Sequence, residues 1–520
     1  MTSTAIPVAE PSPPSSRVPR GEAVTIAVLT AAALMLRVTS LSRSLFTDEA
    51  YSLALAQRSL GHMVELFGYE ANGTPYSIVL WPLIRIFGTG EALLRTPAVL
   101  AGTASVPALW WAARRFAAPT AALLAAALLA INPMAVWYSQ MARPYAFVVL
   151  ATCLAFVALP RALDRPDRRA AWIGYVAAMA ALAYSDLLAA PLVLPAQALI
   201  VARTGRAGVR RWAWSLLALL GCCIPLLVAA AISRSRRNAL YWLPKTSRQL
   251  VELGLQEFTG GFSEVGAVRW VTLAAGAALL AAAIWRLCRV GSRTVERTAF
   301  AVAACWGLLP GALLLVVSFV EPVFWPRYAI LALPGLCLLA ALAVSGLWSD
   351  RRGIVLAGAC TAAIALAAAF ADARQVSHLQ EDWPPIAAWL RADRAAGQPT
   401  IVDNALVLPT LGYYDPAFRA PDGQLVVQEW HDAPLPPGFV GFKDRTSYGS
   451  VPDGPPSAAV FARLAARGGG TAWMMVSEVD TTLQSDPKEG AAVAWARGHC
   501  RVQVRESVGV WVLRATGCVA

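Results

Sequence analysis

Long apolar runs, separated by short polar junctions, occupy most of the chain up to about residue 372. A helix that crosses a bilayer needs about 20 apolar residues, since each residue adds only about 1.5 Å along the helix axis. By this length rule the pattern predicts about eleven membrane-spanning helices. The expected spans are residues 23–41, 92–113, 118–135, 144–161, 171–185, 187–203, 212–232, 267–288, 299–319, 328–347 and 353–371.

The polar junctions differ in charge on the two sides of these spans. Every second junction is rich in arginine, and such junctions stay on the cytoplasmic side of a membrane protein. We therefore expect the N-terminus in the cytoplasm and, with an odd number of spans, the C-terminus on the opposite side. The arginine-rich junctions read AARR (112–115), RALDRPDRR (161–169), RTGRAGVRR (203–211), RLCRVGSRTVER (286–297) and SDRR (349–352).

Residues 1–22 precede the first apolar run and are rich in Pro and Ser. That composition is typical of a disordered segment, because it offers little apolar surface to bury. We expect a disordered cytoplasmic tail. The first apolar run is not followed by a clear small-residue cleavage site, so we expect it to be an uncleaved anchor.

After residue 372 the long apolar runs give way to short segments that alternate between strand and helix patterns. TIVDNALV, GQLVVQEW and TAWMMVSEV are typical of strands, whereas PPSAAVFARLAARGGG and KEGAAVAWARG are typical of helices. In EDWPPIAAWLRADRAAG, Asp382 is placed to cap a helix that begins with two prolines and closes at a glycine. This alternation predicts a small extracytoplasmic α/β domain.

Cys500 and Cys518 bracket two alternating segments joined by a Val-Gly turn. A hairpin of this kind brings its two ends together, so a disulfide is expected there if this end faces an oxidising compartment. The predicted fold is thus a polytopic α-helical membrane protein with a small C-terminal α/β domain. The expected divisions are a tail (1–22), a transmembrane domain (23–372) with an external loop (42–91), and an extracytoplasmic domain (373–520).

Composition supports this class of protein. The 520 residues are 57% hydrophobic and 15% charged, with a mean hydropathy of +0.53, whereas ordinary globular domains carry about 25% charged residues. The formal net charge of +12 fits basic cytoplasmic loops better than nucleic-acid binding. We expect no nucleic-acid partner.

The side opposite the arginine-rich junctions collects carboxylates, cations and aromatic rings. A carboxylate can act as general base on an acceptor hydroxyl that attacks an anomeric carbon. Fixed cations can stabilise the charge that develops on a phosphate leaving group. The candidate catalytic residues are Asp48 and Glu49, and the candidate substrate-binding residues are Arg143, Tyr145, Arg234, Arg236, Arg237, Lys245, Arg327 and Tyr328.

The segment 233–245 is strongly basic although it lies on the side where few cations are expected. One explanation is an anionic substrate group, such as the phosphate of a lipid-linked donor. The alternative is attraction to anionic lipid headgroups at the outer surface.

Several segments resemble one family, the GT-C glycosyltransferases, in the family-39, Rgt- and ArnT-like branch that includes the dolichyl-phosphate-mannose-protein mannosyltransferases. Asp48-Glu49 lies at the position of the family's acidic motif in the first external loop. Four further segments resemble the family in the expected order up to about residue 415. They are GTPYSIVLWPLIRIFGTGEALLRTPAVLAG (73–102), INPMAVWYSQMARPYAFVVL (131–150), FWPRYAILALPGLCLLAA (324–341) and EDWPPIAAWLR (381–391).

This resemblance implies an enzyme that takes a sugar from a polyprenyl-phosphate carrier and transfers it, with inversion, outside the cytoplasmic membrane of a bacterium. Asp48 matches the catalytic base of the family. Two departures are notable. Met141 replaces the acid of the family's Ser-Gln-Glu-Ala-Arg pattern, and Asn72-Gly73-Thr74-Pro75 stands where a His often precedes a Pro pair.

Each candidate residue also has a structural interpretation. Asp48 could cap the following helix, and Glu49 could favour the helix dipole, orient the base or bind a metal ion. Arg143 and Tyr145 could pack their loop against the neighbouring helix. Two adjacent carboxylates could hold a divalent metal ion, although two protein ligands make a thin site.

Two other functions compete with sugar transfer. A transporter or flippase of lipid-linked saccharides predicts charges deep within the spans and duplicated halves of the chain. A membrane-anchored envelope-assembly protein predicts that the soluble domain does the work. The sugar and the acceptor stay open at this stage, the acceptor being a cell-envelope glycan, a glycolipid, lipid A or a protein.

Overall fold

The structure is a computed structural model of the chain. It describes residues 18–67, 74–235, 246–260, 270, 273–274, 276–278, 281, 295–347, 369–370, 373, 381–395, 397–402, 407–420, 422–425, 439–441, 457–477 and 490–519.

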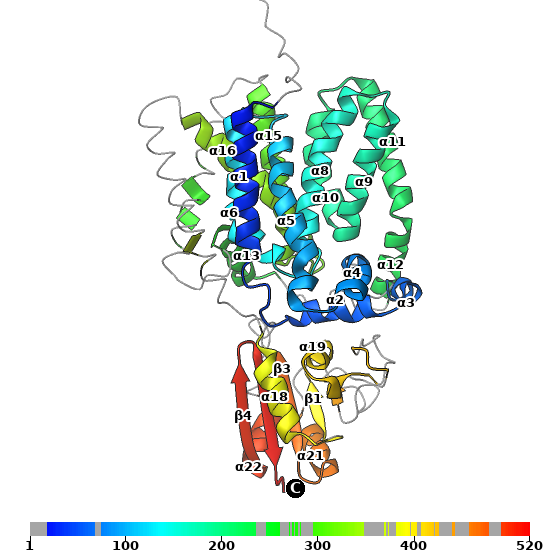
Figure 1. Ribbon diagram of the computed structural model, residues 1–520, viewed down its shortest axis with the longest axis vertical. Coiled ribbons are helices and arrows are strands. Elements are labelled where there is room, and N and C mark those ends of the chain that lie inside the picture. Colours follow the sequence, from blue (N-terminus) through cyan, green and yellow to red (C-terminus); the bar gives the residue numbers. More distant parts are fainter. Residues whose placement is uncertain are drawn as a thin grey trace, which may run out of the picture.

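The first part of the chain is a bundle of long helices (Figure 1). Among the described residues, four stretches are long and apolar enough to cross a bilayer, and up to six are if each of two bent helix pairs counts as one span. The four are α5 (Glu91–Ala113), α8 (Tyr145–Asp164), α15 (Val295–Val317) and the continuous pair η1 (Pro326–Ala332) and α16 (Leu333–Leu347). The bent pairs are α6 (Pro119–Ile131) with α7 (Pro133–Ser139), and α11 (Arg206–Cys222) with α12 (Ile224–Ser235).

Three further helices lie where spans are expected, namely α1 (Arg20–Arg37), α9 (Arg169–Ser185) and α10 (Ala189–Val201). The expected spans at 267–288 and 353–371 lie mostly outside the described residues. The predicted count of about eleven therefore stays a prediction.

The break between α6 and α7 is stabilised by a buried arginine from α1. Pro133 cannot continue the hydrogen-bond ladder of α6, and the two helices meet at 57°. Arg37 is fully buried and donates from Nη1 to the carbonyl of Ala130 (2.9 Å) and from Nε to Ser139 Oγ (3.2 Å). Because a buried carbonyl needs a donor inside a membrane, Arg37 stabilises the bend that directs α7 away from the axis of α6.

α15 and α16 pack closely because glycines face each other. A Cβ atom added to Gly307 would lie 2.7 Å from the backbone nitrogen of Leu336, and one added to Gly335 would meet the backbone of α15 equally closely. Nearby, the rings of Phe156 and Trp306 stack with centroids 3.8 Å apart. The close approach holds η1 against the rest of the bundle.

The predicted external loop 42–91 is mainly helical. It contains α2 (Thr47–Gln57), α3 (Leu60–Leu66) and α4 (Thr74–Phe87). Figure 1 shows α2 and α3 lying across one end of the bundle, with α13 (Arg248–Gly260) at the same end. This end faces the C-terminal part of the chain.

The C-terminal part contains a five-stranded sheet in the order β2-β1-β3-β5-β4. The strands β1 (Thr400–Val402), β2 (Phe439–Gly441) and β3 (Ala472–Ser477) are mutually parallel, whereas β5 (Val510–Thr516) runs antiparallel to β3 and to β4 (Arg501–Ser507). The β4–β5 hairpin turns at Gly509, where the left-handed φ of 67° favours glycine. Cys500 and Cys518 form a disulfide at the open end of this hairpin, with Cα atoms 4.1 Å apart.

Helices cover both faces of this sheet. Side chains alternate along β3, so that Trp473 and Met475 pack with α18 (Trp383–Asp393) and α19 (Val407–Tyr414), while Met474 faces the other side. That other side is covered by α21 (Ala458–Arg467) and α22 (Ala491–His499). Helices α18, α21 and α22 lie within segments whose sequence predicts helix, whereas α19 and β2 were not predicted. The strand expected at GQLVVQEW (423–430) lies mostly outside the described residues.

The prediction that Asp382 caps α18 is partly wrong. Asp382 occupies the N-cap position, but its side chain does not bond the helix backbone. It accepts a hydrogen bond from Ser507 Oγ at 2.9 Å instead. The helix start is thus tied to the β4–β5 hairpin rather than closed on itself.

Candidate active site

The acidic motif lies at the start of α2, on a loop that one buried arginine holds in shape. Arg95, from α5, is fully buried and donates from Nη1 to the carbonyls of Leu41 (2.7 Å) and Arg43 (2.9 Å). It also donates to the carbonyl of Ser44 at 3.1 Å. The loop before α2 is therefore wrapped around a guanidinium group, which fixes where α2 begins.

Glu49 completes this arrangement. Its carboxylate is 1% exposed and accepts from Arg95 Nε (2.8 Å) and Nη2 (2.6 Å). It also accepts from the backbone N–H groups of Phe46 (3.0 Å) and Ala142 (2.7 Å). Burial by itself would raise the pKa of Glu49, but the charge of Arg95 and its hydrogen bonds outweigh this and hold the pKa below its usual range.

Glu49 thus joins the loop before α2 to the α7–α8 connection, since Ala142 precedes Arg143. The geometry fits the orienting role that was considered for Glu49. It does not fit a second base or a metal ligand, because four donors already occupy both carboxylate oxygens. A catalytic role of Glu49 stays a prediction, and the geometry favours the orienting role within it.

Asp48 lies in the first turn of α2 with its side chain 19% exposed. Its Oδ2 atom is 3.9 Å from Arg143 Nε and 3.8 Å from Arg327 Nη2. Both guanidinium groups are largely buried, with side-chain exposures of 11% and 14%. Residues far apart in the sequence therefore place two cations around one carboxylate, and this local excess of positive charge favours an anion.

Aromatic rings surround these cations. The guanidinium carbon of Arg327 is 5.8 Å from the ring centroid of Tyr145 and 5.9 Å from that of Tyr328, which is within cation–π range. The rings of Tyr138 and Tyr145 meet edge to face at 4.9 Å. We call Asp48, Arg143, Tyr145, Arg327 and Tyr328 the Asp48 cluster.

A second carboxylate approaches the Asp48 cluster from α13. Glu257 is 3% exposed and accepts a hydrogen bond from Tyr138 Oη at 3.4 Å. Burial raises its pKa to about 8, although the charge of Arg327 and the Tyr138 hydroxyl act in the opposite direction. Glu257 is therefore mostly neutral at pH 7, and Asp48 is the carboxylate that the described ion pairs place beside both guanidinium groups.

The structure brings together five of the predicted site residues, those of the Asp48 cluster, from α2, the α7–α8 connection, α8 and η1. Arg234 lies near the end of α12, and its side chain is not described. Arg236, Arg237 and Lys245 lie outside the described residues. Figure 1 shows α12 extending to the end of the bundle that carries α2 and α3.

Within the described part of the chain, no group of three or more His, Cys, Asp or Glu residues is arranged to hold a metal ion. Met141, which replaces the family's acid, is buried at 1% exposure.

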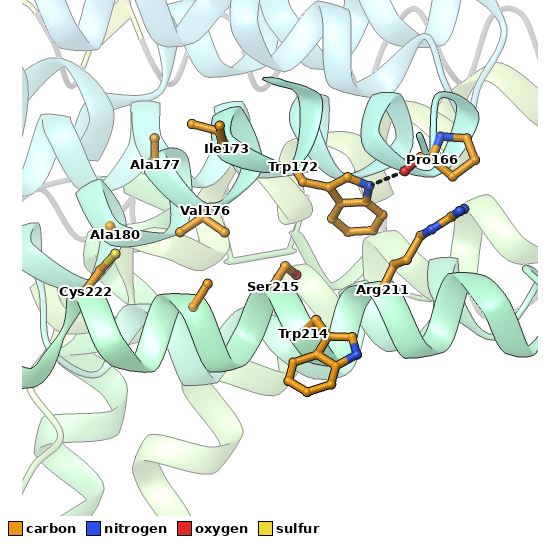
Figure 2. Close-up of a pocket in the computed structure, with 11 residues that line it drawn as sticks. Pro166, Trp172, Ile173, Val176, Ala177, Ala180, Arg211, Trp214, Ser215 and Cys222 are labelled. Atoms are coloured by element: carbon orange, nitrogen blue, oxygen red, sulfur yellow. Dashed lines mark hydrogen bonds between the residues drawn. The ribbon is translucent and has the colours of Figure 1, made fainter. Parts of the chain in front are cut away.

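A groove elsewhere in the bundle contains none of the predicted site residues. It has a volume of about 580 Å³ and lies between α9 and α11 (Figure 2). Its lining is mostly apolar and includes Trp172, whose Nε1 donates to the carbonyl of Pro166 at 3.1 Å, together with Val176 and Trp214. The groove is separate from the Asp48 cluster.

Three residues that organise the site, Arg37, Arg95 and Glu257, were not predicted from the sequence. A signal existed for the two arginines, because each is an ionisable residue inside an expected span and such residues are costly unless they have a role. Glu257 offered no such signal, since it lies in a polar stretch with other charged residues.

Comparison with known proteins gives an independent view of the chain. Residues 75–231 match the family model described as dolichyl-phosphate-mannose-protein mannosyltransferase. No individually curated protein sequence matches the chain.

Solved structures match most of its length. ArnT from Cupriavidus metallidurans bound to undecaprenyl phosphate has a TM-score of 0.56 at 15% identity, covering 95% of this chain and 98% of that one. The apo state of the same protein gives 0.55 at 16% identity, covering 95% and 97%.

More distant matches share the fold as well. The archaeal oligosaccharyltransferase AglB from Archaeoglobus fulgidus, in complex with an inhibitory peptide and a dolichol-phosphate, has a TM-score of 0.51 at 11% identity, covering 96% of this chain and 74% of that one. The arabinofuranosyltransferase AftD from Mycobacteria gives 0.52 at 15% identity, with 97% and 40% coverage. The resemblance to the GT-C glycosyltransferases expected from the sequence is confirmed by this family-model match and by the shared fold.

Proposed function

We propose that the protein is an inverting glycosyltransferase that moves a sugar from a polyprenyl-phosphate donor to an acceptor on the outer face of the cytoplasmic membrane. The observation that carries this proposal is the placement of Asp48 3.8–3.9 Å from two largely buried guanidinium groups. One carboxylate beside two cations provides a base and an anion site within a few ångströms.

In the proposed reaction Asp48 accepts the proton of the acceptor hydroxyl as that oxygen attacks the anomeric carbon. The new glycosidic C–O bond forms on the face opposite the breaking bond to phosphate, so the anomeric configuration inverts. The phosphate leaves with the bonding electron pair and remains on the polyprenyl chain. The proton on Asp48 then passes to solvent, which restores the base.

Arg143 and Arg327 are proposed to bind the donor phosphate. Charge-assisted hydrogen bonds from arginine suit phosphate oxygens, and fixed cations stabilise the charge that develops on the leaving group. The similarity to a protein whose structure contains undecaprenyl phosphate supports a lipid-linked donor of this kind. The basic segment 233–245 is proposed to add to this site, with Arg234, Arg236, Arg237 and Lys245 as its cations.

Tyr145 and Tyr328 are proposed to border the donor beside these cations. Their rings lie within 6 Å of the Arg327 guanidinium carbon, where they shield its charge from water and strengthen its attraction for an anion. Candidate acceptors are a cell-envelope glycan, a glycolipid or a protein.

The proposed location of Asp48 on the outer side of the membrane rests on the contacts of the C-terminal part of the chain. The sheet that carries the Cys500–Cys518 disulfide belongs to the part that contacts the start of α2. Disulfides persist in oxidising compartments, so Asp48 and the disulfide are proposed to lie together outside the cytoplasm. Thiol labelling of cysteines introduced at exposed positions near both sites should mark them on one side of the membrane.

The function is tested by a transfer assay on the purified, lipid-reconstituted protein. Polyprenyl-phosphate sugars are supplied with candidate acceptors, and release of polyprenyl phosphate is measured together with the anomeric configuration of the product. We expect inversion, and we expect Asp48→Asn to lower kcat by about 10²- to 10⁴-fold. The matched control is Asp167→Asn. Asp167 is an exposed carboxylate in the α8–α9 junction and pairs with Arg211 of α11.

Equal rates in wild type and Asp48→Asn would rule out the proposed base. A product that retains the donor configuration would rule out direct displacement. Movement of an intact lipid-linked saccharide across the membrane, without release of polyprenyl phosphate, would favour a flippase.

A further inference from the structure

The C-terminal domain contacts the same short segment that presents Asp48. The backbone N–H of Leu45 donates to Tyr414 Oη at 2.8 Å, and the backbone N–H of Trp383 donates to Ser44 Oγ at 3.2 Å. Further along α2, the N–H of Leu425 donates to Gln57 Oε1 at 3.0 Å. Residues separated by more than 300 positions therefore form one hydrogen-bonded junction along α2.

Glu381 lies at the centre of this junction. It is 1% exposed, and its Oε2 atom accepts from the backbone N–H of Thr47 (2.8 Å) and from Thr47 Oγ1 (2.6 Å). The same oxygen accepts from Trp383 Nε1 at 2.7 Å. Glu381 therefore joins the start of α18 to the residue that immediately precedes Asp48.

This contact supplies something that α2 lacks by itself. The first N–H groups of a helix have no partner within the helix and are usually capped by a Ser, Thr, Asp or Asn side chain. The N-cap residue of α2 is Phe46, whose side chain provides no cap hydrogen bond. Glu49 satisfies the N–H of Phe46, and Glu381 satisfies that of Thr47. A negative charge at this end also suits the helix dipole.

The position of Asp48 depends on this first turn. Its carboxylate approaches the guanidinium groups of Arg143 and Arg327 only to 3.8–3.9 Å, beyond hydrogen-bond distance. Its side chain is therefore held chiefly by the backbone of α2. Any shift at Thr47 moves Asp48 relative to both arginines.

We propose that Glu381 is a positioning residue that holds the base from the C-terminal domain, so that the active site is assembled from both parts of the chain. This inference rests on the proposed function, because it assigns the base to Asp48. It makes docking of the C-terminal domain a requirement for transfer, rather than an accessory contact.

The variant Glu381→Gln tests this in the full-length protein. Since a misplacement of about 1 Å can cost about 100-fold in rate, we expect kcat to fall by about 10- to 100-fold, while KM for the donor changes by less than about threefold. Hydrogen exchange at the amides of residues 44–50 should become faster.

Two matched substitutions separate positioning from general weakening of the domain. Asp393→Asn alters a carboxylate that accepts from the indole of Trp389 at 2.6 Å, much as Glu381 accepts from Trp383, but within the C-terminal domain. It should leave kcat and exchange at residues 44–50 unchanged. Thr47→Val should lower kcat, and Thr47→Ser, which keeps the hydroxyl, should restore most of it.

Combining Glu381→Gln with Asp48→Asn provides the decisive readout. If Glu381 acts through Asp48, the double variant should be no slower than Asp48→Asn alone, within about twofold, because residues that act as a unit are not additive. An equal additional loss in the Asp48→Asn background would show a merely structural role and overturn the inference. Wild-type kcat in Glu381→Gln, with exchange at residues 44–50 unchanged, would overturn it too.

Failure of the proposed function gives a different pattern. In that case Asp48→Asn would be as active as wild type, whatever the effect of Glu381→Gln on hydrogen exchange. The exchange measurement reports on the contact itself and does not depend on which reaction is catalysed.

Discussion

Two adjacent carboxylates, Asp48 and Glu49, have opposite surroundings. Glu49 is buried and accepts four hydrogen bonds, two of them from Arg95. Asp48 is 19% exposed and lies 3.8–3.9 Å from the nearest guanidinium atoms of Arg143 and Arg327. One turn of helix thus carries a carboxylate with no remaining capacity to react and another that can still accept a proton.

The difference shows that two adjacent carboxylates can have different roles, one in organising the site and one in the reaction. The hydrogen bonds of Glu49 join the loop before α2 to Ala142 and so bring Arg143 beside Asp48. A residue that organises a site needs short, saturated contacts, whereas a base needs an accessible lone pair. Substitutions at these residues and their neighbours can test whether Glu49 organises the site while Asp48 reacts.

The largest effect is expected from removing one member of the buried Arg95–Glu49 ion pair. Arg95→Met or Glu49→Gln leaves a buried charge without its partner, which costs about 3–5 kcal/mol of stability. Thermal or denaturant unfolding in detergent measures this loss. Asp48→Asn is the control and should cost clearly less stability than Glu49→Gln, because Asp48 is 19% exposed and lies beyond hydrogen-bond distance of both guanidinium groups. If Glu49→Gln were as stable as wild type, the organising role of Glu49 would be wrong.

The arginines beside Asp48 should matter for rate more than for folding. Arg143→Gln and Arg327→Gln each remove one cation from the proposed phosphate site and should lower kcat/KM by about 10²- to 10³-fold. Lysine should restore only part of the rate, because it lacks the planar fork of arginine. Transfer assays measure this, with Arg211→Gln as the control. Full activity in either glutamine variant would exclude that arginine from the site.

Glu257 differs from both members of the pair, because burial raises its pKa to about 8 whereas the ordinary value is about 4.3. Between these values the folded state holds a proton that the unfolded state releases. The stability that this proton contributes is complete below pH 4.3 and is lost as the pH rises through about 8.

Glu257→Gln should therefore be more stable than wild type by an amount that grows between pH 5 and pH 8, by more than about 1 kcal/mol. Melting temperatures of both proteins across this range give the comparison. A difference that does not depend on pH would show that Glu257 is not held in its neutral form.

The smallest effect is expected at a second pair of adjacent carboxylates, Glu381 and Asp382. Asp382 accepts one hydrogen bond from Ser507 at 2.9 Å, so Asp382→Ala should cost about 0.5–1.5 kcal/mol. Ser507→Ala should cost a similar amount, and the two losses should not add. Unfolding curves test this, and transfer activity should stay at the wild-type level. A loss of activity as large as that of Glu381→Gln would contradict the different roles assigned to Asp382 and Glu381.

The sequence predicted much of this arrangement because strong local patterns carry it. Apolar run length located most of the described bundle helices, and the motifs TDE, MARPY and FWPRY located the five residues of the Asp48 cluster. Alternation around Val508-Gly509 located the β4–β5 hairpin. These features depend on neighbours in the chain.

The sequence could not show which side chains pair with each other when they are far apart along the chain. Glu49 and Asp48 look equivalent in TDEAY, and only the fold places Arg95 against one and Arg327 against the other. Glu381 likewise carries no local signal in EDWPP, and only the fold brings Thr47 against its carboxylate. Such pairings follow from tertiary packing, which overrides local pattern.

Transfer rate and unfolding, measured on the same preparations of Asp48→Asn and Glu49→Gln, separate the two carboxylates most sharply. We expect Asp48→Asn to fold like wild type yet to transfer at least about 100-fold more slowly, whereas Glu49→Gln should lose stability first. An Asp48→Asn protein that is folded and transfers at close to the wild-type rate would show that Asp48 is not the base.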